Sequence, residues 1–195
     1  CADDALQAGT GMLRQMAGLN REREQRGERT LPMGIGVHFG QVMVGIVGGT
    51  AQLQAEALSI NVDLAERLEG LTKFYGVNFL ISQETVDRLA DPGRYHLRVI
   101  DRVRAKGREE GIVVYEGYDA APAEMIRLKN RTRPTFERGV QLYHEGDFTG
   151  AAACMQTVLE HSPRDSTAQF YLDNSLQYRM EGVRVKRDGS GWPFE

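Results

Sequence analysis

The sequence is poor in cysteine and tryptophan. Its 195 residues include two cysteines and one tryptophan. Cys1 and Cys154 do not have metal-ligand spacing, and two cysteines cannot build a disulfide framework. We therefore expect a reducing, cytoplasmic environment. Trp192 lies in a glycine-rich end and is expected to anchor that end rather than to line a site.

Long apolar runs are also missing. No stretch approaches the roughly 20 apolar residues that a membrane-spanning helix needs, and no secretory signal peptide is recognisable. The sequence begins without methionine, inside what we expect to be a helix over residues 2–19. We therefore expect a fragment of a longer protein, whose upstream part could hold a membrane anchor.

The sequence has no strong excess of positive or of negative charge. The chain has 24 basic and 27 acidic residues, which gives a net charge of -3 at pH 7. In the charged segment 20–30 the arginines alternate with glutamates, so we expect a solvated helix end rather than a nucleic-acid arm. The composition predicts a globular protein without nucleic acid as a partner.

Alternation of apolar and small residues predicts two paired strands within residues 33–47. In the first strand Ile35, Val37 and Phe39 share one face. The glycines and His38 share the other face, which lets another group approach the backbone closely. For His38 we expect local hydrogen bonds within the fold, because no second histidine or carboxylate lies near it in the sequence.

The stretch 55–76 contains the most informative pattern. Asn61 can cap a helix whose apolar residues recur at spacings of three and four, namely Val62, Ala65, Leu68, Leu71 and Tyr75. The other edge of this helix carries Asp63, Glu66 and Arg67. Asp63 and Arg67 stand four residues apart, so they either form a surface ion pair or present an arginine that binds phosphate.

The following residues predict further elements of the same domain. We expect a strand over 77–82 and a short helix capped by Ser82. A strand from Tyr95 to about Arg104 should turn at Gly107 and return as a strand over 112–115.

From residue 119 the composition changes. Residues 119–133 are typical of a linker, and 134–180 predict two or three helices within a helical extension over 134–195. The extension is similar to a tetratricopeptide-like helical hairpin, in which Gly146, Phe148, Ala151 and Pro163 occupy the expected positions.

Three sequence blocks together resemble the C-terminal part of a class III adenylate and guanylate cyclase domain. In chain order they are GIGVHFGQVMVGIVGG, VDLAERLEGLTKFYGVNFLIS and RVRAKGREEGIVVYE. The resemblance implies an α+β fold over residues 1–118: a partial ferredoxin-like cyclase sheet with helices on one face. The C-terminal helical hairpin would follow it.

The resemblance also implies roles for four residues in a site shared across a dimer. Arg67 would stabilise the transition state, Asp63 would lie against the ribose, and Lys106 would reach the triphosphate. Glu56 would occupy the base-selecting position, where a carboxylate accepts a hydrogen bond from the amino group of adenine and so favours ATP over GTP. Lys106 can equally be a solvated hairpin lysine.

Two departures from the family limit the expected activity. Asp63 replaces an asparagine that can donate to the sugar, and its carboxylate repels a triphosphate. The two aspartates that bind Mg²⁺ or Mn²⁺ in the family would lie upstream of this chain, because Asp3 and Asp4 are in the wrong element. No metal ligand is therefore expected here, and the chain should supply one half of the site in a homodimer or with a complementing cyclase subunit.

The leading prediction is part of an adenylate cyclase that forms cyclic nucleotide and pyrophosphate from a nucleoside triphosphate. The alternative is a degenerate, non-catalytic module that binds a regulatory partner or a nucleotide. A third interpretation, a helical interaction protein acting through residues 134–180, explains less of the chain.

Overall fold

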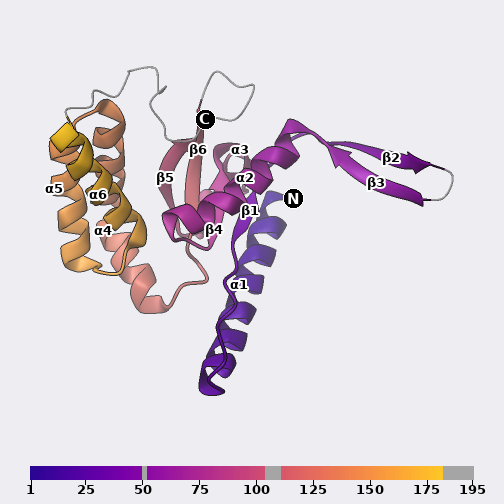
Figure 1. Cartoon of the computed structure of the whole chain (residues 1–195), viewed down its shortest axis with the longest axis horizontal. Helices are drawn as coiled ribbons and strands as arrows, with labels where there is room; N and C mark the ends of the chain where they lie inside the picture. The colour runs from indigo at the N-terminus through magenta and orange to yellow at the C-terminus, as the bar shows by residue number, and fades with distance from the viewer. Residues whose placement is uncertain (50–51, 104–110, 182–195) are drawn as a thin grey trace. The chain divides into compact units, whose positions relative to one another are not determined.

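The structure is a computed structural model, and it describes residues 1–49, 52–103 and 111–181 (Figure 1). The chain divides into two compact units, Cys1–Ala120 and Ala121–Glu195. In the described ranges, no helix combines the length and the apolar character needed to cross a membrane.

The first unit contains a four-stranded sheet in the order β1-β4-β6-β5. These strands are β1 (Ile35–Val37), β4 (Phe79–Ser82), β5 (Leu97–Val103) and β6 (Ile112–Gly117). The pair β1 and β4 is parallel, whereas β4 with β6 and β5 with β6 are antiparallel. The predicted return of the chain from β5 to β6 is confirmed. Its turn, with Gly107 and Lys106, lies outside the described residues.

Helix α1 (Ala2–Gln25) covers one face of this sheet. Leu6 and Leu13 of the helix pack in one apolar cluster with Phe79 and Ile81 of β4. The helix continues well past residue 19, through most of the charged segment 20–30. Arginine and glutamate are good helix formers, so the charged residues extend the helix into solvent.

Helix α2 (Ile60–Tyr75) covers the opposite face. Ile35 and Val37 pack against the α1 cluster, while Gly36 between them lies against the backbone of α2. Successive strand residues point to opposite faces, so the two helices lie on opposite sides of the sheet. The α+β class is therefore confirmed, whereas the helices do not share one face as expected.

The start of α2 differs from the prediction. Its N-cap is Ser59, whose hydroxyl accepts a hydrogen bond from the backbone N–H of Asn61, and its C-cap is the left-handed Gly76. Val62 is 36% exposed, and the buried stripe begins instead at Leu64. The reason is that, at 3.6 residues per turn, Val62 lies far round the helix from Leu64, Leu68 and Leu71, which form the buried side. Leu68, Leu71 and Tyr75 are buried as predicted.

A second, two-stranded sheet is formed by β2 (Met43–Gly49) and β3 (Gln52–Leu58). The predicted pairing of the two strands within residues 33–47 is therefore wrong. β1 pairs with β4, and β2 pairs with a strand that the sequence pattern did not predict. Alternation indicates which residues share a face, but it does not indicate which strand lies alongside.

Two short helices complete this unit, namely α3 (Gln83–Val86) and a 3₁₀ turn (Pro92–Arg94). The predicted cap of α3 is confirmed, because the Ser82 hydroxyl accepts a hydrogen bond from the backbone N–H of Thr85.

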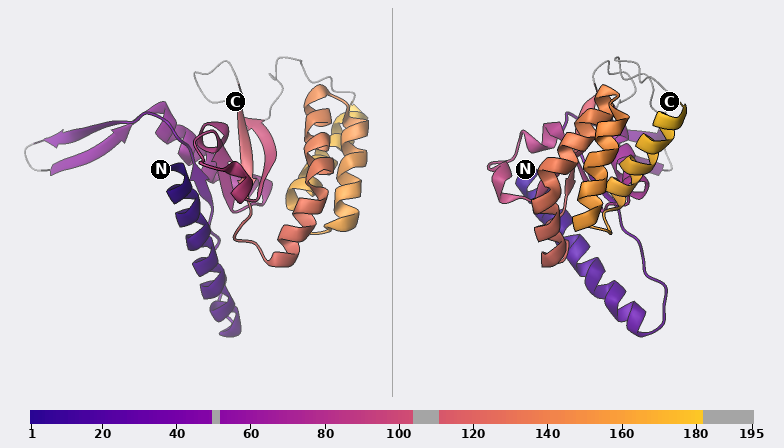
Figure 2. Two further views of the ribbon diagram at one scale, coloured as in Figure 1. Left: turned by 180° about the vertical axis from the view of Figure 1, so that it is seen from behind. Right: turned by 90° about the vertical axis from the view of Figure 1, so that its left-hand side faces the viewer.

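In its described residues, the second unit consists of three helices that pack side by side (Figure 2). They are α4 (Ala123–Glu145), α5 (Phe148–His161) and α6 (Ser166–Glu181). Residues 123–133, expected within a linker, belong to α4, because most of them favour helix and the helix continues through Pro134. Gly146 ends α4 in the left-handed conformation, and Asp147 caps α5.

Candidate functional site

Helix α2 lies on an unusually bare strip of backbone. The strip is formed by three glycines of the chain segment that includes β1, namely Gly34, Gly36 and Gly40. A Cβ atom on Gly36 would overlap with the backbone of Ala65 and Glu69. Equivalent atoms on the other two glycines would overlap with side chains of α2, those of Thr72 and Asn61. The glycine face predicted from the sequence is therefore the surface on which α2 packs. We call these three glycines the glycine seat.

The predicted site residues of α2 lie on a different flank. With 3.6 residues per turn, Asp63, Arg67, Gly70 and Phe74 form a row beside the buried stripe. The other side of that stripe carries the residues that contact the glycine seat. Asp63 is exposed, Arg67 is half-buried and Phe74 is 36% exposed. The row therefore presents a carboxylate, a guanidinium and an aromatic ring beside the packed face of the helix.

The surface ion pair considered for Asp63 and Arg67 does not form in the part of the chain that the structure describes. A neighbouring pair on the same helix, Glu69 and Lys73, does approach to 4.0 Å. Arg67 is thus not neutralised by Asp63 and can meet an anionic ligand.

The other two predicted residues are placed less fully. Glu56 belongs to β3, where its backbone pairs with Gly45 of β2, and it precedes α2 in the chain. Its side chain lies outside the described atoms. Lys106 lies outside the described residues altogether. Of the four predicted residues, the structure brings Asp63 and Arg67 together on one helix.

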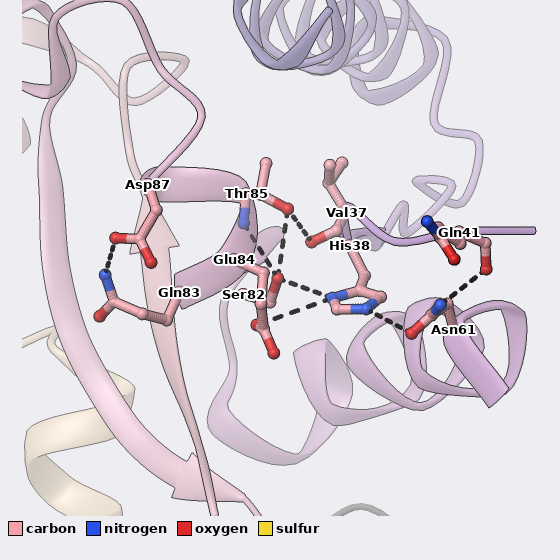
Figure 3. A network of polar contacts seen from close by, with 9 residues as sticks. All are labelled: Val37, His38, Gln41, Asn61, Ser82, Gln83, Glu84, Thr85 and Asp87. Carbon is pink, nitrogen blue, oxygen red and sulfur yellow. Dashed lines mark hydrogen bonds and ion pairs between the residues drawn. The ribbon is translucent and has the colours of Figure 1, made fainter.

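A buried histidine network lies at the N-terminal end of α2 (Figure 3). The side chain of His38 is fully buried. Its Nδ1 lies 2.8 Å from Ser82 Oγ, and its Nε2 lies 3.0 Å from Asn61 Oδ1. The expectation that His38 is satisfied by local hydrogen bonds is therefore confirmed. The three residues come from three elements: the end of β1, the first turn of α2 and the end of β4.

The hydrogen bonds of Asn61 assign the tautomer of His38. The Nδ2 group of Asn61 donates to the backbone carbonyl of Gln41 at 2.7 Å, so its Oδ1 faces the imidazole. An amide oxygen only accepts, and therefore Nε2 of His38 carries the proton. In the neutral ring, Nδ1 then accepts a hydrogen bond from the hydroxyl of Ser82.

A carboxylate also approaches the ring. Oε2 of Glu84, in α3, lies 3.8 Å from Nδ1 of His38. Sequence reasoning missed this contact because the two residues are far apart in the chain. The one available signal was the histidine on a glycine face, where a polar side chain needs partners from another element.

The C-terminal end of α2 is also attached through buried polar groups. The hydroxyl of Tyr75 donates to the carboxylate of Asp101 in β5. On the same face of the sheet, Nε of Arg98 donates to Glu116 at 2.6 Å, and both of these side chains are buried. Hydrogen-bonded polar side chains therefore hold α2 at each end, in addition to its apolar stripe.

Within the described ranges, no group of three or more His, Cys, Asp or Glu side chains converges to hold a metal ion. No chemical step is therefore assigned to a metal on these residues.

The chain is similar in sequence to known nucleotide cyclases. Residues 2–116 match the model of the adenylate and guanylate cyclase catalytic domain. An adenylate cyclase of Anabaena cylindrica is 41% identical over 119 residues, which are 58% of this chain and 24% of that protein. The terminal-differentiation-specific adenylate cyclase of Dictyostelium discoideum is 30% identical over 145 residues, 74% of this chain and 7% of that protein.

Two further proteins are similar to part of this chain. Adenylate cyclase 1 of Rhizobium meliloti (strain 1021) is 30% identical over 115 residues, which cover 59% of this chain and 17% of that protein. The crystal structure of the guanylyl cyclase Cya2 aligns at a TM-score of 0.48 with 27% identity, over 60% of this chain and 59% of that one. The chain thus spans about a quarter or less of the curated relatives that it matches.

Proposed function

We propose that this chain, which belongs to the adenylate and guanylate cyclase catalytic domain family, forms one half of an adenylate cyclase active site. The reaction would convert ATP to cyclic AMP and pyrophosphate for cyclic-nucleotide signalling. The observation that carries the proposal is the row on α2 in which Arg67 stands without an ion pair to Asp63. The adenylate cyclases among the relatives support ATP as the substrate.

Arg67 takes the electrostatic role. Negative charge builds on the transferring phosphoryl oxygens, and a guanidinium held on a rigid helix stabilises that charge without reorganising during the reaction. Its half-buried position on α2 restricts the directions in which the side chain can point. This geometry supports a positioned cation rather than a freely solvated one.

Asp63, Glu56 and Lys106 take the binding roles. Asp63, one turn before Arg67, would accept a hydrogen bond from the ribose. Glu56 would accept one from the amino group of adenine, and the carbonyl of guanine would be repelled by the same carboxylate. Lys106 would reach the triphosphate from the connection between β5 and β6.

The partner that we propose is a second copy of the chain or a complementing cyclase subunit. Apolar side chains are exposed where β1 leads into β2 and where β3 leads into α2. They are Phe39, Val42, Met43, Ile60 and Val62, with exposed fractions between 36 and 76%. Hydrogen bonds from Ser59 and Asn61 to the carbonyl of Gln41 hold these two connections together. Such a concentration of exposed apolar residues is typical of an interaction surface, and it lies next to the first turn of α2.

A non-catalytic regulatory module is the second candidate. The observation that favours it is the exposed carboxylate of Asp63 in the row that would receive a triphosphate. Like-charge repulsion would weaken nucleotide binding there. The C-terminal helices would then serve as a tetratricopeptide-like surface for a partner.

The test is cyclic-nucleotide production from ATP and from GTP by the natural protein that contains this chain, in the presence of Mg²⁺ or Mn²⁺. Arg67→Ala should lower the rate with ATP by roughly 100-fold or more, as removal of a transition-state donor does. Arg21→Ala, an exposed arginine of α1, is the matched control and should leave the rate unchanged.

The outcomes separate the two candidates. Cyclase activity that survives Arg67→Ala would contradict the proposed role of Arg67 in stabilising the transition state. A folded parent protein that carries the metal-binding aspartates and still makes no product would favour the regulatory module.

A further inference from the structure

We propose that His38 is a positioning residue for α2: through Asn61 it sets the rotation of the helix about its axis and thereby the direction of Arg67. The effect on catalysis rests on the proposed function. The effect on the helix itself does not, and it can be measured separately.

Both ring nitrogens of His38 have hydrogen-bond partners. The side chain is fully buried, and each ring nitrogen has a partner on a different element. Burying an imidazole without partners would cost free energy, so the ring favours the one arrangement in which both contacts are made. His38 therefore links Ser82, at the end of β4, to Asn61 of α2 (Figure 3).

Asn61 transmits this link to α2. Its amide accepts from His38 and donates to Gln41, so its orientation is fixed from two sides. The hydroxyl of Ser59 donates to the same carbonyl of Gln41 at 2.9 Å. Three hydrogen bonds thus converge on the N-cap and first turn of α2.

The rotation of α2 about its axis depends on directional contacts at its N-terminal end. Where α2 crosses the segment that includes β1, the glycines there offer no side chains to interlock with the helix. Apolar burial is roughly proportional to area and has no direction, whereas a hydrogen bond requires a defined angle. At the N-terminal end of α2 the directional contacts come from the His38 network.

A rotation of α2 also changes the direction of Arg67. Asn61 lies on the flank that faces the glycine seat, and Arg67 lies on the flank across the buried stripe. A rotation of the helix that moves Asn61 off His38 moves Arg67 with it. A displacement of about 1 Å in a reacting geometry can cost roughly 100-fold in rate.

The experiment compares His38→Leu, His38→Gln and the parent protein by hydrogen exchange over residues 59–67 and by steady-state kinetics with ATP. His38→Leu should accelerate exchange in this segment and lower kcat by about 10- to 100-fold, with little change in KM. His38→Gln places an amide N–H near the position of Nε2 and should restore most of both properties. Asn61→Ala removes the same bond from the other side and should reproduce the effect of His38→Leu.

A stability control separates positioning from general destabilisation. Leu13→Ala opens the core on the α1 face of the sheet, away from α2. It should lower the melting temperature without the kcat-specific loss and without selective exchange at 59–67. Unchanged exchange at 59–67 in His38→Leu, or equal kinetic losses in both variants, would overturn the proposal. If the parent itself makes no cyclic nucleotide, the proposed function fails while the exchange result still decides the role of His38.

Discussion

Gly36 of β1 lies directly against the carbonyl of Ala65 in α2, so that strand and helix meet backbone to backbone. A Cβ atom at this position would overlap with main-chain atoms, which cannot swing aside as the end of a flexible side chain can. The close approach brings the helix that carries Asp63 and Arg67 down onto the sheet.

Gly36→Ala should therefore displace α2 and lower the free energy of unfolding by about 1–3 kcal/mol, the range for overpacked sites. Urea denaturation measures the loss, and cyclase activity should fall with it. Gly70→Ala is the matched control, because a Cβ on this exposed helical glycine meets nothing within 4 Å. That variant should gain about 0.5–1 kcal/mol from helix propensity. Equal effects at the two glycines would contradict the close contact.

Replacing the carboxylate of Asp63 should strengthen nucleotide binding. Asp63→Asn removes a negative charge from the proposed triphosphate site and supplies an N–H that can donate to the ribose. The substitution should lower the free energy of unfolding by about 0.3–1 kcal/mol, because a negative charge in the first turn of a helix interacts favourably with the helix dipole. Calorimetric titration with ATP measures the affinity, in the presence of a complementing cyclase half.

Glu66→Gln provides the comparison for Asp63→Asn. Glu66 is also exposed on α2, but it lies off the row that contains Arg67. It should leave nucleotide affinity nearly unchanged. An Asp63→Asn protein that binds ATP no better than the parent would argue against repulsion as the reason for weak binding.

The stability of the α1 attachment should depend on pH through Asp3. The hydroxyl of Tyr95 donates a hydrogen bond to the carboxylate of Asp3 at 2.8 Å. The backbone N–H of Ala90 donates a second one to the same carboxylate at 3.1 Å. These bonds, that of Tyr95 foremost, lower the pKa of Asp3 below its ordinary value of 3.8. A lowered pKa means that the stabilisation is present above pH 3.8 and is lost as the pH falls through the folded value.

Thermal denaturation of the parent and Tyr95→Phe as a function of pH checks this expectation. Tyr95→Phe should melt lower at neutral pH, and the difference should shrink once the pH falls below 3.8. Burial, and after it the bond to Asp3, raises the pKa of Tyr95 above 10.0. The parent should therefore lose stability again as the pH rises through that raised value. A difference that stayed constant from pH 7 to acid would show that the contact does not involve the ionised carboxylate.

The local parts of this fold were predictable, whereas the contacts between distant segments were not. Leu68, Leu71 and Tyr75 were identified as buried because helical periodicity is a property of neighbouring residues. The partner of β1 was missed because strand pairing depends on β4, which follows a helix and a hairpin. The position of Arg67 on α2 could be predicted, but the attachment of that helix through His38 could not, since Asn61 and Ser82 belong to other elements.

The helical unit should depend on the ring of Tyr143, which is only 7% exposed. Its centroid lies 5.5 Å from that of Phe148 in α5, and 5.0 and 6.1 Å from those of Tyr171 and Tyr178 in α6. One ring of α4 thus contacts both other helices, so its removal loosens the contacts that α4 makes with α5 and with α6. Tyr143→Ala should cost about 3–5 kcal/mol, as large aromatic truncations in cores do.

Hydrogen exchange on the full chain locates this loss. Protection should fall along residues 123–181 and remain in the strands of the first unit, because each compact unit has its own core. Gln156→Ala, at an exposed position of α5, is the control and should change stability by no more than about 0.5 kcal/mol. If protection in β4 and β6 fell together with that of the helices, the two units would unfold as one, and the C-terminal helices would be part of the stability of the cyclase domain.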